Sequence, residues 1–583
     1  MHRYRTHTCG ESRKENVGQR IKLAGWIDTI RDHGGVIFID LRDHYGVTQI
    51  VFNDENLIKG LGREDVISVE GPLRERSADT VNPKLETGEV EVKAETLELL
   101  GQSEHQLPFD IGDSMQVRED LRLTYRYLDL RNPPVHDRIV LRSKITRFLR
   151  NKMEEHGFIE IQTPILTSSS PEGARDYLVP SRKHHGMFYA LPQAPQQFKQ
   201  LLMVSGFDKY FQIAPCFRDE DARADRSPGE FYQLDFEMAF ATQDDVLDTA
   251  EKVLYDTFAE FTKNTRKKVN TAPFRRIPYS ESMMKYGTDK PDLRNPLIIN
   301  DLSLFFADVD FAPFRNKPVR SIVVPDCVKQ PKSFFERMLA FATEEAGMKG
   351  LGYISILSGM ELKGPIVKFL TPDKQRALVD MLSLKENDTL FFICDAEKLV
   401  NAMAAQIRTE LGKQLGLIDA DSFEFCFITD FPMYGVNEET GALEFTHNPF
   451  SMPQGEMRAL ETMNPLDIKA YQYDFVCNGV ELSSGAVRNH RPDVMVKAFE
   501  IAGYSKADIE SRFAALYNAF HYGAPPHAGM APGLDRIVML LSGQENIREV
   551  TAFPMNGSAQ DLLMGAPSSV TEQQLREVHI KIR

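Results

Sequence analysis

The feature that most constrains the fold is a pair of segments, 211–218 and 230–240, in which apolar and polar side chains alternate with a period of two. Such alternation is typical of β-strands, because successive side chains point to opposite faces of a sheet. The loop between the segments carries a Pro228-Gly229 turn signal. The stretch therefore predicts an antiparallel hairpin with one apolar face and one polar face.

The polar face of this hairpin carries many charged and amide groups together with one thiol, namely Gln212, Cys216, Arg218, Glu220, Gln233, Asp235 and Glu237. Two interpretations stay open from this stretch alone. A half-solvated antiparallel sheet commonly shows such a pattern. The alternative is a floor of cations and carboxylates that holds a polyanion and its metal.

The length of 583 residues predicts several domains, about four at ~150 residues each. Residues 20–100 contain five short strand-like segments, which suggest a small barrel of the oligonucleotide-binding type. The segments at 105–114 and 128–137 are expected to be linkers. A helix is expected over 137–158, with an apolar stripe at Leu141, Ile145, Phe148 and Leu149 and a C-cap at Gly157.

The six cysteines lie far apart and form no Cys-x-x-Cys pair, so neither a zinc knuckle nor a disulfide framework is indicated. No run reaches the ~20 apolar residues of a membrane span, and the N-terminus has no apolar signal core. These features predict a reducing, cytoplasmic location. The net charge of −15 argues against indiscriminate nucleic-acid binding, but a local patch can still hold a specific RNA.

The sequence contains no G-x-x-x-x-G-K-[ST] loop, no dinucleotide fingerprint and no H-E-x-x-H. The segment "APGLDRIVMLLSG" offers a different phosphate device. Gly533 precedes an apolar helix whose first turn contains Arg536. A cation there opposes the helix dipole, so an anion bound at that end explains it better than a solvated arginine does.

The segment "YDFVCNGVELSSGAVRNH" places Asp474 and Glu481 on the two arms of a hairpin with an Asn478-Gly479 turn. Mg²⁺ commonly binds through one or two carboxylates plus substrate phosphates. Taken alone, the same segment is better explained as a surface hairpin.

Taken in order along the chain, these motifs resemble those of the class II aminoacyl-tRNA synthetases. "FRDE…GEFYQLDFE" resembles motif 2, "GLDR" motif 3, and the helix, strand and Pro164 motif 1. The segments "SPEG", "LPQAPQQFKQLLM", "YGTDKPDLRNP", "ITDFPM", "THNPFS" and "PPHAGMAPGLDR" tighten the resemblance to the bacterial-type aspartyl-tRNA synthetases. It extends nearly from end to end.

The resemblance implies an α+β multidomain fold. Its parts would be a five-stranded OB-type anticodon-binding barrel (1–108), a hinge (109–138), the first part of an antiparallel-sheet catalytic domain (139–283), an inserted α+β module of the GAD type (284–421) and the second catalytic part with a C-terminal extension (422–583). It also implies aspartate, ATP and tRNA as substrates, Mg²⁺ as cofactor and a homodimer.

The resemblance also assigns site residues. Catalysis would involve Arg218, Arg536 and Glu481, and Mg²⁺ would bind Asp474 and Glu481. Aspartate would contact Glu172, Gln196, Lys199, Arg218, Gln233, Asp235, His447 and Arg488. ATP would contact Arg218, Asp219, Glu220, Phe231, Glu481, Gly533, Leu534, Asp535 and Arg536. The motif 2 loop is one residue longer than in some relatives, so the ATP contact of a family glutamine does not carry over to Ser227.

Lys199 and Arg488 are expected to face the side-chain end of the bound amino acid. A buried anion needs paired cations, because an unpaired buried charge costs several kcal/mol. A neutral or basic side chain would leave these two cations uncompensated. On this reasoning they select aspartate over asparagine or lysine, and the aspartate α-carboxylate then attacks the α-phosphorus of ATP.

Residues expected to read the anticodon are Arg31, His33, Phe38, Gln49 and Asp79. Phe38 is either a platform for a base or an edge aromatic under a loop. The pair His33-Gly34 and the loop 77–83 resemble the corresponding segments of synthetases with relaxed tRNA specificity, which charge both aspartate and asparagine tRNA. Such an enzyme needs an amidotransferase downstream. The alternatives are a strictly discriminating enzyme, a non-catalytic nucleic-acid-binding protein and a tRNA-independent amidating ligase.

Overall fold

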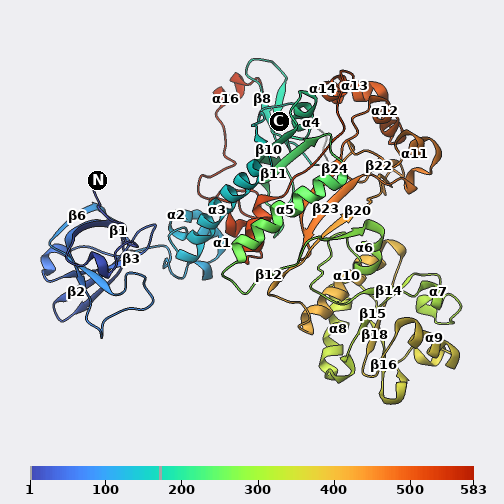
Figure 1. The fold of residues 1–583 in the computed structure, drawn as a ribbon, viewed down its shortest axis with the longest axis horizontal. Helices are drawn as coiled ribbons and strands as arrows, with labels where there is room; N and C mark the ends of the chain where they lie inside the picture. The colour runs from blue at the N-terminus through green and yellow to red at the C-terminus, as the bar shows by residue number, and fades with distance from the viewer. Residues whose placement is uncertain (1–2, 105, 170–173, 583) are drawn as a thin grey trace. The chain divides into compact units, whose positions relative to one another are not determined.

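A computed structural model of the chain describes residues 3–104, 106–169 and 174–582. The chain divides into two compact units, 1–117 and 118–583, and each is described here by itself (Figure 1).

The N-terminal unit is a small β-barrel. Its strands are β1 (Arg20–His33), β2 (Val36–Arg42), β3 (Val47–Phe52), β4 (Val66–Glu75), β5 (Val90–Lys93) and β6 (Thr96–Gly101). The first five close into a ring in the order β1-β2-β3-β5-β4, because β4 pairs back onto β1. Strand β6 adds to β4 as a sixth strand.

The sixth strand corrects the expectation of one continuous strand over residues 88–100. The backbone N–H of Ala94 donates to Val51 on β3, whereas that of Glu95 donates to Glu70 on β4. The chain therefore changes partners between these two residues. The buried face expected on β2 is confirmed, because Ile37, Ile39 and Leu41 all lie in the barrel core.

The second unit begins with α1 (Glu119–Thr124), α2 (Arg126–Asp129) and α3 (Pro133–Glu155). The expectation of a linker over 128–137 is therefore wrong. Pro133 occupies the first helical position, where its missing N–H costs no hydrogen bond, so α3 starts earlier than its apolar stripe suggests. The stripe itself is confirmed at Ile145 and Leu149, which are fully buried, and Gly157 adopts a φ of 80°.

The centre of the second unit is an eight-stranded sheet in the order β13-β20-β23-β24-β25-β11-β10-β7. The two outermost pairs, β13 with β20 and β10 with β7, are parallel and the others are antiparallel. The bounds are β7 (Ile159–Glu160), β10 (Lys209–Arg218), β11 (Gly229–Ala239), β13 (Arg275–Pro278), β20 (Phe425–Thr429), β23 (Gln472–Cys477), β24 (Val480–Val487) and β25 (His527–Met530).

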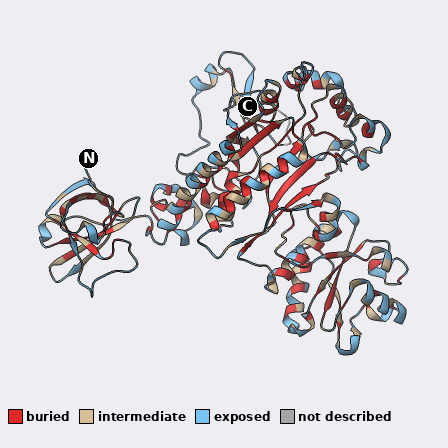
Figure 2. Ribbon diagram, viewed as in Figure 1, coloured by how far each residue is buried: buried red, intermediate tan, exposed pale blue. Residues whose placement is uncertain are grey.

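One face of this sheet packs against α3, α5 (Gln243–Thr262) and α15 (Leu534–Leu541). Figure 2 shows the strands of the large sheet as buried elements under these helices. Phe236 of β11 and Phe475 of β23 lie in this core with Val253 of α5. Since side chains alternate, the polar residues of the same strands point to the opposite face, where α4 (Gln196–Val204) covers β10 and β11.

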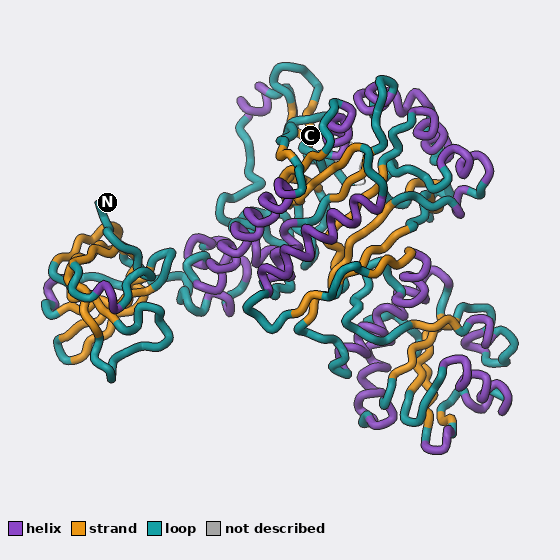
Figure 3. The backbone as a smooth tube through the Cα atoms, viewed as in Figure 1, coloured by secondary structure: helices purple, strands orange, loops and turns teal. Residues whose placement is uncertain are grey.

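The inserted part has its own five-stranded antiparallel sheet in the order β14-β15-β18-β16-β17. Hydrophobic clusters lie on both of its sides. The tube in Figure 3 separates its strands from the surrounding helices. The bounds are α6 (Tyr279–Tyr286), β14 (Ile299–Asp301), α7 (Ser303–Phe306), β15 (Val319–Val324), α8 (Lys332–Glu344), β16 (Gly352–Ile356), β17 (Leu362–Lys363), α9 (Pro372–Leu382), β18 (Thr389–Cys394) and α10 (Glu397–Gln414).

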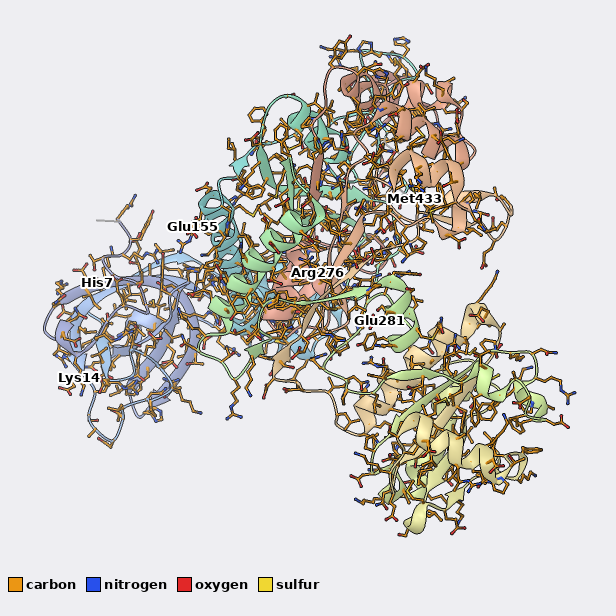
Figure 4. All side chains as sticks on the ribbon, turned by 45° about the vertical axis from the view of Figure 1, so that its right-hand side comes forward. His7, Lys14, Glu155, Arg276, Glu281 and Met433 are labelled. Atoms are coloured by element: carbon orange, nitrogen blue, oxygen red, sulfur yellow. The ribbon has the colours of Figure 1, made fainter. Side chains whose placement is uncertain are left out.

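The chain enters this insert directly from the large sheet. In Figure 4, Arg276 marks the strand β13 and Glu281 marks the helix α6 that follows it. The remaining elements are β8 (Leu178–Pro180), β9 (Phe188–Ala190), β12 (Lys268–Val269), β19 (Ser422–Phe423), β21 (Tyr434–Val436), β22 (Leu443–Phe445), α11 (Glu456–Thr462), α12 (Pro492–Ile501), α13 (Lys506–Arg512), α14 (Ala514–Phe520) and α16 (Glu572–Glu577). Within the described ranges, every helix is too short or too polar to span a bilayer.

Candidate active site

A cavity of about 360 Å³ opens on the polar face of the large sheet. Its walls come from α4, the hairpin β10–β11, the hairpin β23–β24, the start of α15 and the loop 447–450. The predicted residues that line it are Gln196, Lys199, Arg218, Glu220, Phe231, Gln233, Asp235, His447, Asp474, Glu481, Arg488, Gly533, Asp535 and Arg536.

Two predicted residues have other surroundings, and a third, Glu172, lies outside the described residues. Asp219 is half exposed and lies 3.9 Å from Arg175, away from the cavity lining. Leu534 has its side chain in the hydrophobic core, so only its backbone is available to a ligand.

The floor of the cavity is a buried network of four charges. Lys199 Nζ lies 2.7 Å from Asp235 Oδ1 and 3.3 Å from Glu237 Oε2. Arg488 donates from Nε and Nη2 to the two oxygens of Glu237, at 2.8 and 3.1 Å. All four side chains are at most 2% exposed, so the half-solvated sheet that the alternation also allowed is not what the chain forms.

This network corrects one step of the sequence reasoning. Lys199 and Arg488 are not uncompensated cations, because Asp235 and Glu237 already neutralise them. Burial raises the pKa of Asp235, and Lys199 only partly offsets that effect. Burial would also raise the pKa of Glu237, but the neighbouring Arg488 and Lys199 hold it below its ordinary value.

Helix α4 presents its polar residues to the network at a spacing of three and four. Gln196, Lys199 and Gln200 therefore share one side of the helix and are all buried. Among the described residues, the amide nitrogen Nε2 of Gln196 has no hydrogen-bond partner. A buried donor without a partner costs free energy, so this group is suited to an acceptor on a bound ligand.

His527 on β25 contacts Gln200 of α4. Its Nε2 is 3.2 Å from Gln200 Oε1, and its Nδ1 is 2.8 Å from the carbonyl oxygen of Pro525. Burial lowers the pKa of His527 to about 4. The ring is therefore neutral at physiological pH and supports α4 through hydrogen bonds rather than charge.

Arg218 stands at the end of β10 over the ring of Phe231 on the paired strand. Its guanidinium carbon is 4.9 Å from the ring centroid, and Nε donates to the carbonyl oxygen of Gln193. Glu220, further along, forms an ion pair of 2.8 Å with Arg226 of the loop. A cation, an aromatic ring and a carboxylate thus line one end of the cavity.

Arg536 in the first turn of α15 is held on both sides. It donates from Nη1 to the carbonyl oxygen of Glu481 at 2.7 Å and from Nε to that of Asp225 at 3.1 Å. The interpretation as a merely solvated arginine is therefore wrong. Asp535 beside it accepts the backbone N–H of Tyr232 and forms an ion pair with Arg142 of α3, so both of its oxygens are engaged by the protein.

Asp474 and Glu481 come together across the β23–β24 hairpin, as their spacing predicts. A bulge between Phe475 and Val476 shifts the register, and Gly479 turns the chain with a φ of 81°. Burial raises the pKa of Asp474, and the nearby Glu481 raises it further.

The described residues contain no cluster of three or more acidic, histidine or cysteine side chains suited to a metal. Two carboxylates open to the same cavity nevertheless fit Mg²⁺, which takes its remaining ligands from phosphates and water.

Sequence reasoning missed two residues here. The period-two pattern placed Glu237 on the polar face with Gln233 and Asp235, but the list of expected site residues gave it no role. Lys290 lies 3.3 Å from Glu481 Oε2, and nothing in the local sequence signals that contact. His447 lines the cavity with its ring 4.8 Å from that of Phe431, and burial lowers its pKa.

Residues 118–557 match the family model of class II tRNA synthetases for D, K and N. This match covers well over half of the chain. The chain belongs to the class II tRNA synthetases. Residues 21–100 match the model of the OB-fold nucleic acid binding domain.

Curated relatives match the synthetase over its full length. It is 55% identical to the aspartate–tRNA(Asp/Asn) ligase of Rickettsia prowazekii (strain Madrid E) and 54% identical to that of Rickettsia felis, with 100% of this chain and 98% of each relative covered. The fold matches asparaginyl-tRNA synthetase of Pyrococcus horikoshii in complex with asparaginyl-adenylate at a TM-score of 0.57 and 19% identity, covering 94% of this chain and 97% of that one. It matches aspartyl-tRNA synthetase from Entamoeba histolytica at 0.56 and 19%, covering 93% and 89%.

The barrel of the synthetase carries a polar row across β1, β2, β3 and β5. Arg31 donates from Nη2 to Asp40 at 2.8 Å and to Gln49 Oε1 at 3.3 Å. Gln49 in turn donates to Glu91 at 2.8 Å, which makes Glu91 a member of the row that the sequence reasoning did not include. The ring of Phe38 lies edge-on to His33, with 5.6 Å between centroids, and Asp79 is exposed in the loop 77–83.

Proposed function

We propose that this synthetase is an aspartate–tRNA(Asp/Asn) ligase, which activates L-aspartate with ATP and transfers it to aspartate tRNA and asparagine tRNA. The observation that carries the proposal is the full-length identity of 53–55% to relatives of that name, joined to a cavity in which the predicted site residues converge.

The floor of the cavity suits aspartate even though its charges are already balanced. Arg488 Nη1 and one Nζ proton of Lys199 are not used in the contacts to Glu237 and Asp235. These donors are fixed by their ion pairs and would receive the oxygens of the substrate side chain. An asparagine amide would turn its own N–H donors toward them, so donor would face donor. The buried donor of Gln196 would take an oxygen of the same substrate.

Activation joins two anions, the α-carboxylate of aspartate and the α-phosphate of ATP, and pyrophosphate leaves. Neutralising these charges and positioning the two reacting groups are therefore expected to supply most of the rate acceleration. Arg218 would bridge the two reacting groups, and Phe231 and Glu220 would hold the adenine. Arg536, already held between Asp225 and Glu481, would bind the terminal phosphate.

Asp474 and Glu481 would hold Mg²⁺, which offsets phosphate charge when bound. In the second step, a hydroxyl of the terminal adenosine of the tRNA attacks the activated carbonyl, and AMP leaves.

Relaxed anticodon reading would arise in the barrel. The row from Arg31 to Glu91 presents fixed donors and acceptors to one base, and Phe38 offers a ring for stacking. His33, the last residue of β1 before the turn at Gly34, would contribute to this relaxed reading. The asparagine tRNA that is mischarged with aspartate would then need an amidotransferase.

A homodimer is proposed because apolar side chains are exposed on the segments that follow α3. Ile159 on the edge strand β7 is 55% exposed, and the others are Ile165, Leu166, Leu178, Met187 and Phe188. An exposed apolar patch is typical of an interface, and these side chains are the candidates to form one. A reducing, cytoplasmic location agrees with the cysteines, none of which forms a disulfide in the described part of the chain.

The test is aminoacylation of purified aspartate tRNA and asparagine tRNA with radiolabelled aspartate. Both are expected to be charged, with kcat/KM values within about tenfold of each other, because one mismatched base contact costs ~1–3 kcal/mol and a relaxed site avoids that cost. Charging of aspartate tRNA alone would reject the relaxed specificity. Absence of aspartate-dependent ATP–pyrophosphate exchange would reject the ligase itself.

A further inference from the structure

Lys290, which lies outside the three class II motifs, contacts Glu481 in the wall of the cavity. Its ammonium lies 3.3 Å from Glu481 Oε2 and 2.8 Å from Asp289 Oδ2. Arg536 Nη1 lies 3.8 Å from the other oxygen of the same carboxylate, Glu481 Oε1. Glu481 is therefore flanked by two cations, one from α15 and one from the segment that leads into the insert.

The leading segment of the insert lies against the hairpin that carries the carboxylates. Gly479, at the hairpin turn, lies beside this segment, since a Cβ there would be in ordinary van der Waals contact with it, 3.4 Å from the Cβ of Asp292 and 3.8 Å from the carbonyl oxygen of Lys290. The position of Lys290 is thus defined by backbone packing as well as by its ion pairs.

The insert itself holds this segment in place. Arg408 on α10 is 2% exposed and donates to the carbonyl oxygens of Asp292, Asn295 and Leu297, at 3.0, 2.7 and 2.6 Å. Asn295 returns a hydrogen bond to the carbonyl oxygen of Arg408 at 2.8 Å. A buried guanidinium whose donors are taken up by one short loop fixes the shape of that loop.

The charges explain why a cation is needed at this point. Asp474 is buried beside Glu481, and two adjacent carboxylates in a poorly solvated site repel each other. Lys290 supplies positive charge to this pair. A divalent cation that binds the same carboxylates therefore has to displace the ammonium from Glu481.

We propose that Lys290 belongs to the nucleotide site, where its ammonium pairs with Glu481 beside Asp474 and competes with the divalent cation that accompanies ATP. The insert, through Arg408, sets the position of this competitor and so adjusts the metal affinity of the catalytic site. This inference rests on the metal site described under the proposed function.

The experiment measures Mn²⁺ binding to the nucleotide-free enzyme by the loss of the EPR signal of free Mn²⁺. Lys290→Ala is expected to tighten Mn²⁺ binding about five- to tenfold, because a half-exposed ammonium at this distance opposes the metal by roughly that factor. Lys290→Arg keeps the charge and is expected to stay close to the wild type. The Mg²⁺ concentration that half-saturates aspartate-dependent ATP–pyrophosphate exchange should fall in Lys290→Ala.

Two controls separate the possible failures. Lys285→Ala removes an exposed lysine of α6 that pairs with Glu281 at 2.8 Å, and it should leave Mn²⁺ binding unchanged. Glu481→Gln should weaken Mn²⁺ binding. If Glu481→Gln weakens it but Lys290→Ala leaves it within twofold of the wild type or weakens it too, Lys290 does not compete with the metal. If neither variant changes it, the carboxylate pair is not the metal site, and both the site and the inference are overturned.

Discussion

Replacing Glu237 by glutamine is the sharpest test of the buried charge network. Glu237 is fully buried, accepts two hydrogen bonds from Arg488 and lies 3.3 Å from Lys199. Glutamine has nearly the same shape, so the cavity keeps its volume. It removes one negative charge and turns an amide N–H donor toward either Arg488 or Lys199.

The magnitude follows from burial. Breaking a buried ion pair by changing one partner costs about 3–5 kcal/mol, because the other charge remains buried without compensation. The glutamine oxygen still accepts one hydrogen bond, and Asp235 stays beside Lys199. We therefore expect a loss of unfolding free energy at the lower end of this range, about 3 kcal/mol. A loss of about 3 kcal/mol lowers the Tm of a domain of 150–250 residues by roughly 6–12 °C, and the Tm of the catalytic unit, which is larger, should fall by somewhat less.

The assay is thermal unfolding at pH 7.5, with Glu281→Gln as the matched control. Glu281 forms an exposed ion pair with Lys285 on α6, so the same substitution there should cost less than ~0.5 kcal/mol. Equal Tm values for the two variants would refute the reasoning, because they would mean that Glu237 carries no desolvated charge balance.

A second arm of this test uses pH. The pKa of Glu237 in the folded protein lies below its ordinary value, because Arg488 and Lys199 outweigh the effect of burial. Its contribution to stability is therefore complete above the unfolded-state value of ~4.5 and is lost as the pH falls through the lower folded-state pKa. The Tm difference between wild type and Glu237→Gln should narrow on acidification, and a constant difference down to pH 3 would contradict this assignment.

Three further predictions concern other parts of the molecule. Arg218→Ala should slow aspartate-dependent ATP–pyrophosphate exchange by ~10²–10³-fold, as expected for loss of one preorganised donor, whereas Arg276→Ala at the surface should not; equal rates would exclude Arg218 from the reaction. His527 has a pKa of about 4 when folded against an ordinary 6.5, so its contribution to stability is present above pH 6.5 and declines toward pH 4 by up to ~3 kcal/mol. Urea titrations across that range should show a shallower decline in His527→Gln than in the wild type. His33→Leu should lower charging of asparagine tRNA about tenfold relative to aspartate tRNA without changing pyrophosphate exchange, and an unchanged tRNA ratio would remove His33 from anticodon reading.

The sequence predicted much of the fold because its signals are local. The alternation at 211–240, the apolar stripe of α3 and the Asn478-Gly479 turn each depend on neighbouring residues, and the structure contains all three elements. The site residues were predicted largely from resemblance to a family, and most of them line one cavity.

What the sequence could not supply depends on contacts between distant segments. Alternation shows that Asp235 and Glu237 share a face, but not that Arg488, some 250 residues later, arrives to neutralise Glu237. The same limit applies to Lys290, whose partner Glu481 lies across the insert. The linker expected at 128–137 failed for a local reason, since Pro133 starts a helix as readily as it ends a strand.

The contacts of Asp535 have a consequence for mutations remote from the ligands. This carboxylate ties Arg142 of α3 to the backbone of Tyr232, which lies between Phe231 and Gln233 in the cavity wall. A small displacement of α3 is therefore transmitted through Asp535 to the cavity wall. Substitutions on that helix should impair turnover while substrate-contacting side chains stay intact, so a loss of activity there is no sign of a second active centre.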